Sequence, residues 1–279
     1  MQTFLSAAEL NKKLNDSNWV IIDCRFNFDE PELGYQEYLA GHIPGAIYAN
    51  LNRDLSSEVI PGKTGRHPLP NQKVLTEKFS SWGIDESIMV IIYDDHGGGL
   101  AARLWWLLRW LGHEEALILD GGWSAWQAAD YDVETDVSSG KAKVFSPVEH
   151  SQFVVNADEV DLIRMDPDYF LIDSRGAERY WGIEENIDPV AGHIPGAMTA
   201  PYAGNLDEDG FFLPLEQLKE RFKNLLEDIP PEQVVFYCGS GVTACHNIAA
   251  MIAAGYEMPK LYAGSWSEWI TDPDRPIEP

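Results

Sequence analysis

The sequence has few cysteines and no long apolar run. Its three cysteines, Cys24, Cys238 and Cys245, are too few and too odd in number for a disulfide framework, which favours a reducing compartment. The first ten residues, MQTFLSAAEL, lack the basic segment and apolar stretch of a secretory signal, and no segment is apolar enough for a membrane span. We therefore expect a cytoplasmic protein without a membrane partner.

Basic residues are also scarce. Lys and Arg number 20 against 45 Asp and Glu, which gives a net charge of −25. A protein that binds nucleic acid or an anionic membrane needs a basic surface, so both partners are excluded, and a small anionic substrate would need its own cluster of arginines or backbone N–H groups. Cys24, His42 and His67 lack the spacing of metal ligands, so neither a metal nor another cofactor is expected.

The chain contains two copies of one pattern, about 150 residues apart, which indicates a duplicated domain. GHIPGA occurs at residues 41–46 and again at 192–197. Three further pairs follow the same order: WVIIDCR (19–25) with YFLIDSR (169–175), IMVIIYDDHGGG (88–99) with QVVFYCGSG (233–241), and ILDGGWSAW (118–126) with LYAGSWSEW (261–269).

Each copy alternates short apolar strands with helices. Ser6 with Glu9, and Asn156 with Glu159, have the spacing of capping boxes at helix starts, and the helices at 100–112 and 243–255 end in glycine. Buried strands that alternate with helices indicate a parallel sheet covered on both faces. We predict two tandem α/β domains, residues 1–135 and 151–279, joined by a polar linker at 136–150.

Cys238 stands where a strand meets a glycine-rich turn and a helix. In a parallel α/β sheet, ligands bind at this carboxyl end of the strands. Successive N–H groups of residues 239–244 would form an anion-binding nest, which would lower the pKa of the thiol. The first copy has Asp94 at the equivalent turn, so only the second copy carries a nucleophile. The alternative is a structural cysteine at a tight turn.

The motifs DCR/DSR, GHIPGA, CGSGVTA and GSWSEW together resemble those of tandem-domain sulfurtransferases of the rhodanese superfamily. The resemblance implies two rhodanese-like domains, an inactive N-terminal one and a catalytic C-terminal one. It also implies that Cys238 takes a sulfane sulfur from a small anionic donor to form a persulfide. The persulfide then yields the sulfur to an acceptor such as cyanide, a thiol or thioredoxin.

The loop after Cys238 resembles that of the mercaptopyruvate branch of the family rather than the thiosulfate branch, whose loop carries Arg and Lys. In the mercaptopyruvate branch, the counterpart of Ser240 assists proton transfer to the pyruvate enolate, with a histidine and an acid behind it. His67 matches the histidine. The place of the acid falls at Asn52, with Asp54 close but out of register.

For binding the donor, the resemblance implies two arginines and the loop itself: Arg179, Arg175, Gly239, Gly241, Val242 and Thr243. Mercaptopyruvate enzymes have a further arginine nine residues after the first, where this chain has Asp188. We therefore expect 3-mercaptopyruvate as the donor, with thiosulfate as the alternative.

Several residues have a structural interpretation as well. Arg175 can pair with Asp173, because the same DxR occurs in the copy without a nucleophile. His42 and His193 are expected to fix the GHIPGA loops. Cys245 is expected to be a packed thiol, with a resolving role as the alternative.

Two other classes of protein fit parts of the pattern. A cysteine phosphatase would need an arginine at the end of a Cys-x5-Arg loop, whereas Thr243 is followed by Ala244, Cys245 and His246. A non-catalytic binding module remains an alternative, in which Cys238 would be no more reactive than Cys24.

Overall fold

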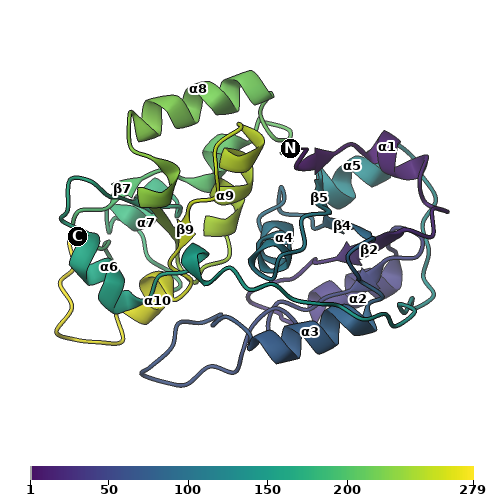
Figure 1. Ribbon diagram of the computed structural model, residues 1–279, viewed down its shortest axis with the longest axis horizontal. Coiled ribbons are helices and arrows are strands. Elements are labelled where there is room, and N and C mark those ends of the chain that lie inside the picture. Colours follow the sequence, from purple (N-terminus) through teal and green to yellow (C-terminus); the bar gives the residue numbers. More distant parts are fainter. Residues whose placement is uncertain (1) are drawn as a thin grey trace.

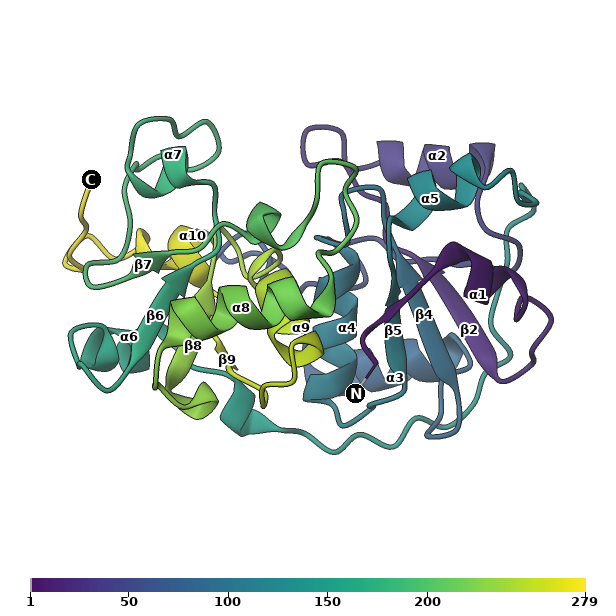
Figure 2. The same ribbon diagram turned by 90° about the horizontal axis from the view of Figure 1, so that it is seen from above.

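The computed structural model describes residues 2–279 and contains two parallel β-sheets, each flanked by helices. The two α/β units lie side by side (Figures 1 and 2). This arrangement confirms the predicted α/β fold with a parallel sheet in each copy.

The first sheet has the strand order β1-β5-β4-β2-β3, with every neighbouring pair parallel. Its strands are β1 (Phe4–Leu5), β2 (Trp19–Asp23), β3 (Ile47–Tyr48), β4 (Met89–Tyr93) and β5 (Ala116–Leu119). Helices α1 (Ala7–Asn11) and α5 (Gly122–Ala128) pack on one face, and α3 (Gln72–Ser81) and α4 (Ala101–Trp110) pack on the other. Helix α2 (Leu33–Ala40) precedes the first GHIPGA loop.

The second sheet has the order β7-β6-β8-β9 and is also parallel. Its strands are β6 (Phe170–Asp173), β7 (Met198–Thr199), β8 (Val234–Tyr237) and β9 (Lys260–Leu261). One face packs against α6 (Ala157–Ile163), α7 (Ala177–Tyr180) and α10 (Ser265–Trp269), and the other against α8 (Leu215–Leu226) and α9 (Ala244–Ala253). Three short 3₁₀ helices complete the unit, at Ser151–Phe153, Tyr202–Asn205 and Pro231–Gln233.

The two copies agree in detail. Both predicted capping boxes form, at Ser6 with Glu9 and at Asn156 with Glu159. The ring nitrogen Nδ1 of His42 lies 2.7 Å from the carbonyl oxygen of Tyr38. His193 repeats this contact with Tyr180 at 2.9 Å. The two histidines therefore fix the GHIPGA loops, as predicted.

Helices α4 and α9 join the two units. All residues of α4 are buried, as are residues 244–252 of α9, and the two helices pack against each other (Figures 1 and 2). A single apolar core runs through this contact from one sheet to the other. The tryptophan-rich stretch of α4 thus serves packing within and between the domains.

Two irregular segments cross between the units. Residues 136–150 contain no helix or strand and run along the first domain, with Phe145 buried against it. The loop between β3 and α3 extends in the opposite direction, beneath α10 of the second domain (Figure 1). This loop carries His67 to the second domain.

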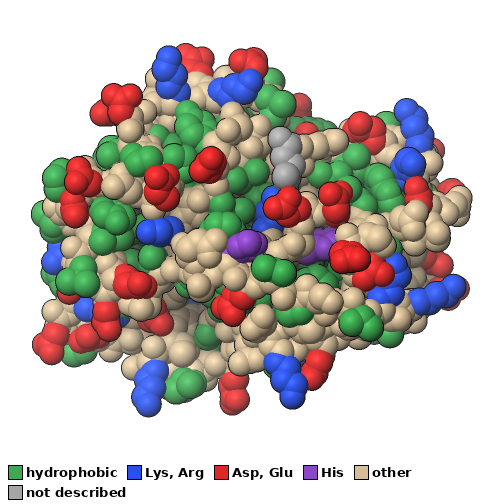
Figure 3. All heavy atoms as spheres, in the orientation of Figure 1, with side chains coloured by type: hydrophobic (Ala, Val, Ile, Leu, Met, Phe, Trp, Pro, Cys, Tyr) green, Lys and Arg blue, Asp and Glu red, His purple; other side chains and the backbone are tan. Residues whose placement is uncertain are grey.

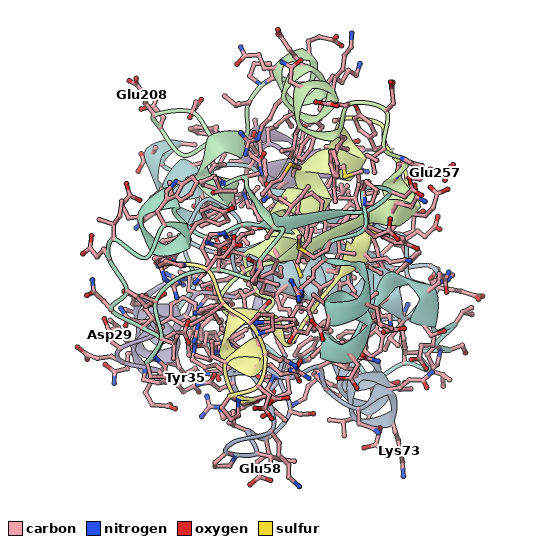
Figure 4. All side chains as sticks on the ribbon, turned by 90° about the vertical axis from the view of Figure 1, so that its left-hand side faces the viewer. Asp29, Tyr35, Glu58, Lys73, Glu208 and Glu257 are labelled. Carbon is pink, nitrogen blue, oxygen red and sulfur yellow. The ribbon has the colours of Figure 1, made fainter. Side chains whose placement is uncertain are left out.

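On the face shown in Figure 3, acidic side chains are scattered rather than gathered in one patch. Asp29, Glu58, Glu208 and Glu257 are exposed and point outward at the periphery (Figure 4). The negative charge is therefore largely solvated. Among residues 2–279, no helix is both long and apolar enough to cross a membrane.

Candidate active site

Cys238 is the first residue after β8, at the carboxyl end of the second sheet, and its exposed fraction is 2%. The backbone around it is tied to the turn before α10. The N–H of Cys238 donates to Ser265 Oγ at 3.1 Å, and its carbonyl oxygen accepts from the N–H of Trp266 at 3.0 Å. The thiol therefore has a fixed position beneath the loop that follows it.

Hydrogen bonds from the loop favour the thiolate. Burial alone would raise the pKa of Cys238, and it is the largest single influence. The side chain of Thr243 and the backbone N–H groups of Ser240 and Ala244 donate to the sulfur, and together they bring the pKa below the usual value. This is the anion-binding nest that the sequence predicted.

The first copy has the same nest around Asp94, the first residue after β4. One carboxylate oxygen accepts from the N–H groups of His96 and Gly98, both at 2.8 Å, and the other accepts from Leu100 and Ala101, both at 2.7 Å. Burial raises the pKa of the Asp94 carboxyl in spite of these donors. Because both oxygens face only donors, the group is bonded as a carboxylate, and the turn is filled by its own side chain.

Two loop residues are constrained by close packing. Gly241 has φ +72°, and a Cβ there would collide with the carbonyl oxygen of Ala263, so glycine is required. Val242 is 2% exposed and belongs to the core. Among the predicted loop residues, Thr243 therefore acts on the sulfur directly, whereas Gly241 and Val242 hold the shape of the loop.

Ser240 and His67 meet across the two domains, as predicted. Ser240 Oγ lies 2.7 Å from His67 Nδ1, and both residues are buried. Burial first, then the charges of Arg103 and Arg66, lower the pKa of His67 to about 3. The imidazole is therefore neutral at physiological pH and can position the serine hydroxyl.

Neither Asn52 nor Asp54 is placed as an acid behind His67. The carboxylate of Asp54 accepts from the N–H of Asn50 at 2.8 Å and from Lys78 Nζ at 2.6 Å. Asn52 is exposed. Among the described residues, no acid is therefore in contact with His67, and the pair of Ser240 and His67 stands without a third member.

Arg103 on α4 is a part of the site that the sequence analysis did not single out. It is fully buried, and its guanidinium donates to the carbonyl oxygens of His67 at 3.0 Å and Gly241 at 2.9 Å. It also lies within 3.4 Å of the Leu55 carbonyl. Arg103 therefore ties the histidine-bearing loop to the cysteine loop. An arginine in the middle of an apolar helix was the available signal.

Arg175 is engaged in a structural ion pair. Its guanidinium donates to Asp173 at 2.6 Å and to the carbonyl oxygen of Gly192 at 2.7 Å. Arg25 makes the same two contacts, with Asp23 and Gly41, in the copy without a nucleophile. The side chain of Arg175 is 1% exposed, so the geometry favours the structural interpretation over donor binding.

Arg179 lies beside the loop that follows Cys238 and is partly accessible, with 21% of its side chain exposed. Its Nε donates to Glu185 at 2.9 Å, and its Nη2 donates to Asp188 at 2.8 Å. Arg66, from the β3–α3 loop, binds the other oxygen of Asp188. A Cβ added at Gly239 would lie 2.7 Å from Arg66 Nη2 and 3.4 Å from Arg179 Nη1, so both guanidiniums adjoin the residue after the cysteine.

The other two cysteines are free and buried, and both are in settings that disfavour a thiolate. Burial raises the pKa of Cys245 to about 12, and its thiol lies 3.4 Å from the Gly241 carbonyl oxygen. Burial also raises the pKa of Cys24, and the carboxylates of Asp23 and Asp94 add to the effect. Cys245 is thus a packed thiol, as expected from the sequence.

Within residues 2–279, no group of three or more His, Cys, Asp or Glu side chains could hold a metal ion. The site is instead a single cysteine with a lowered pKa at the carboxyl end of a parallel sheet, surrounded by hydrogen-bond donors and flanked by arginines. Such a fold and site define a cysteine-dependent enzyme built from a duplicated α/β domain.

Comparisons with known proteins agree with this description. The rhodanese-like domain family matches residues 6–129 and 156–272. The chain is 46% identical over 274 residues to a Pseudomonas aeruginosa protein named "Probable 3-mercaptopyruvate sulfurtransferase", covering 98% of this chain and 96% of that one. It is 33% identical to "Thiosulfate/3-mercaptopyruvate sulfurtransferase 2" of Arabidopsis thaliana, covering 96% of this chain and 84% of the relative.

Among solved structures, the fold resembles that of the 3-mercaptopyruvate sulfurtransferase from Leishmania major, with a TM-score of 0.85 and 31% identity. The match covers 96% of this chain and 74% of that one. The chain belongs to the rhodanese-like family, with two copies of its domain.

Proposed function

We propose that this protein is a sulfurtransferase that moves a sulfane sulfur from 3-mercaptopyruvate to a thiophilic acceptor through a persulfide on Cys238. The second domain, residues 151–279, is the catalytic one. Residues 1–135 form an inactive domain that supplies His67 and Arg103, and residues 136–150 link the two. The observation that carries the proposal is the lowered pKa of Cys238 within its nest of donors.

In the first half-reaction, the Cys238 thiolate attacks the sulfur of 3-mercaptopyruvate. An S–S bond forms, the C3–S bond breaks, and its electron pair remains on C3 as the enolate of pyruvate. The enolate takes a proton from the Ser240 hydroxyl, which is held by His67 Nδ1 at 2.7 Å, to give pyruvate. The proton on the donor's sulfur passes to the serine oxygen and restores the hydroxyl. The outer persulfide sulfur then carries the negative charge, which the nest stabilises.

In the second half-reaction, the acceptor attacks the outer sulfur and Cys238 leaves as a thiolate. Cyanide, a small thiol or a thioredoxin-type dithiol all have the required nucleophile. We place this chemistry in the cytoplasm, where the reducing environment keeps thiol acceptors available. Three free cysteines are consistent with that compartment.

Thiosulfate is the second candidate donor. Arg66 and Arg179 adjoin Gly239 and would suit a dianion, and the Arabidopsis relative bears both donors in its name. The loop itself favours mercaptopyruvate, because residues 239–243 carry no charge and present a serine hydroxyl, which only an enolate-forming donor requires.

The test compares kcat/KM for the two donors with cyanide as acceptor, in the wild type and in Cys238→Ser. We expect mercaptopyruvate to be preferred and Cys238→Ser to abolish turnover with both donors. Cys245→Ser is the matched control and should retain activity, because Cys245 is a packed thiol. Activity in Cys238→Ser would refute the persulfide mechanism, and a preference for thiosulfate would reverse the assignment of the donor.

A further inference from the structure

Arg103 is a fully buried cation that the described residues leave without a carboxylate. Its guanidinium donates to the carbonyl oxygens of His67 and Gly241, and within residues 2–279 no Asp or Glu forms an ion pair with it. Arg25 and Arg175 are also buried, and each has an aspartate 2.6 Å away. A buried charge is costly unless an opposite charge offsets it. The setting of Arg103 therefore calls for another kind of anion nearby.

The acidic groups that act on Arg103 are two thiols. Burial lowers the pKa of the guanidinium, and Cys245 and Cys238 raise it again. Cys245 is a neutral thiol at physiological pH, because burial raises its pKa to about 12. Cys238 has a lowered pKa, so its thiolate is the anion that can offset the buried charge.

The contact of Arg103 with the cysteine loop has a counterpart in the opposite direction. Gly97 and Gly241 occupy equivalent places in the two turns, with φ of +62° and +72°. From α4, Arg103 Nη1 donates to the carbonyl oxygen of Gly241 at 2.9 Å. From α9, which packs against α4 (Figures 1 and 2), His246 Nε2 lies 3.0 Å from the carbonyl oxygen of Gly97. Each turn is therefore held by a side chain from the other domain.

The two cross-domain contacts differ in charge. Burial lowers the pKa of His246 to about 4, so the imidazole at the Asp94 turn is neutral at physiological pH. Arg103 brings a positive charge to the equivalent glycine of the Cys238 turn. A thiol is a much weaker acid than a carboxyl group, so it gains more from a nearby cation at neutral pH. The cation thus lies at the turn whose residue needs help to ionise.

We propose that Arg103 is a positioning residue of the loop after Cys238 and that its buried charge offsets the anion on this cysteine, both as the thiolate and as the persulfide. The persulfide part rests on the proposed function, whereas the thiolate exists before any donor binds. The N-terminal domain then has an electrostatic role in the reaction, because it supplies the cation from α4.

The pH profile of iodoacetamide alkylation at Cys238 tests the proposal. Arg103→Gln keeps hydrogen-bond donors and removes the charge, and we expect the pKa of Cys238 to rise by about one pH unit. Arg103→Lys keeps the charge and loses the fork of donors, so most of the pKa depression should remain. Other charged or titratable groups beside Cys238 are Arg66, Asp173 and Tyr202, and these variants leave them unchanged.

His246→Gln is the matched control. It alters the reciprocal contact at Gly97, so it should lower stability without moving the alkylation profile of Cys238. A wild-type profile in Arg103→Gln, or an equal rise of the pKa in Arg103→Lys, overturns the proposal. If mercaptopyruvate leaves no persulfide on Cys238, the proposed function fails, and the profiles of the free thiol still decide the role of Arg103.

A second measurement leaves Arg103 in place, so it stands even where Arg103→Gln does not fold. The NMR signal of the Arg103 Nε–H is followed between pH 5 and 10 in the wild type and in Cys238→Ser. The other titratable groups that interact with Arg103 have pKa values outside this range, about 3 for His67 and about 12 for Cys245. We expect the signal to shift with the ionisation of Cys238 and to stay constant in Cys238→Ser. A constant signal in the wild type contradicts the proposed interaction.

Discussion

The hydroxyl of Thr243 is expected to set the reactivity of Cys238, because it donates to the sulfur and favours the thiolate. Thr243→Val keeps the shape of the side chain and removes the donor. A hydrogen bond to a charged group is worth about 1.5–3 kcal/mol, and loss of it disfavours the charged form. The pKa of Cys238 must therefore rise, and below that pKa the thiolate fraction falls roughly ten- to hundredfold.

The alkylation rate should change less than the thiolate fraction. A more basic thiolate is intrinsically more nucleophilic, with a Brønsted coefficient of about 0.4–0.5, so about half of the loss on a logarithmic scale is recovered. We expect the variant to react with iodoacetamide roughly three- to tenfold more slowly than the wild type at acidic pH. At a pH above the pKa of Cys238 in both proteins, this thiol is fully ionised in the wild type and in the variant. The variant should then react faster than the wild type by a similar factor.

The assay is the pH profile of iodoacetamide alkylation, followed at Cys238 by mass spectrometry of the peptide. Cys24 and Cys245 serve as internal references, because burial raises the pKa of both thiols, that of Cys245 to about 12. Thr243→Ser retains the hydroxyl and should follow the wild-type profile. Profiles for Thr243→Val and the wild type that superimpose would refute the assignment of Thr243 as the donor.

Two further variants separate catalysis from stability. Ser240→Ala should lower kcat for mercaptopyruvate about hundredfold, because it removes the proton donor. Turnover of thiosulfate should change little, because its leaving group is sulfite. Equal losses of kcat with both donors would contradict the role of Ser240. Because the pKa of His67 is about 3, kcat should show no histidine limb between pH 5 and 8. Asp94→Asn places an amide nitrogen against the N–H donors of the turn. We expect the free energy of unfolding, measured with urea, to fall by about 2–4 kcal/mol while kcat/KM is unchanged. A decrease below about 0.5 kcal/mol would show that the hydrogen bonds to Asp94 are not needed for stability.

The sequence predicted the features that depend on local chemistry. Short stretches of sequence carry the repeated motifs, the capping boxes and the apolar strands. They predicted two α/β domains, each with a parallel sheet, and placed Cys238 at the end of a strand. Ser240 and His67 were paired through the family resemblance, and the structure brings them within 2.7 Å.

The contributions of Arg66 and Arg103 could not be predicted, because they depend on how the two domains pack. Arg103 lies on an apolar helix, and its role appears once α4 meets α9 and the guanidinium reaches two carbonyl oxygens of different loops. Arg66 depends on the path of the β3–α3 loop, which is irregular and has no periodicity. Asp188 was identified by position as a departure from the family pattern, and only the fold shows what it binds.

The turn at Asp94 in the first domain and the turn at Cys238 in the second bind chemically similar groups. An aspartate side chain runs from Cβ through Cγ to an oxygen, and a cysteine persulfide runs from Cβ through Sγ to an outer sulfur. The carboxylate oxygens of Asp94 therefore lie at the same step along the side chain as the outer persulfide sulfur on Cys238, and the residue two positions on donates its N–H in both copies. The first domain thus holds permanently, as a carboxylate in a closed nest, the kind of anion that the second domain would hold, in the proposed mechanism, only between its two half-reactions. A turn so occupied has no nucleophile, which is why the proposed function assigns one active site to a duplicated fold.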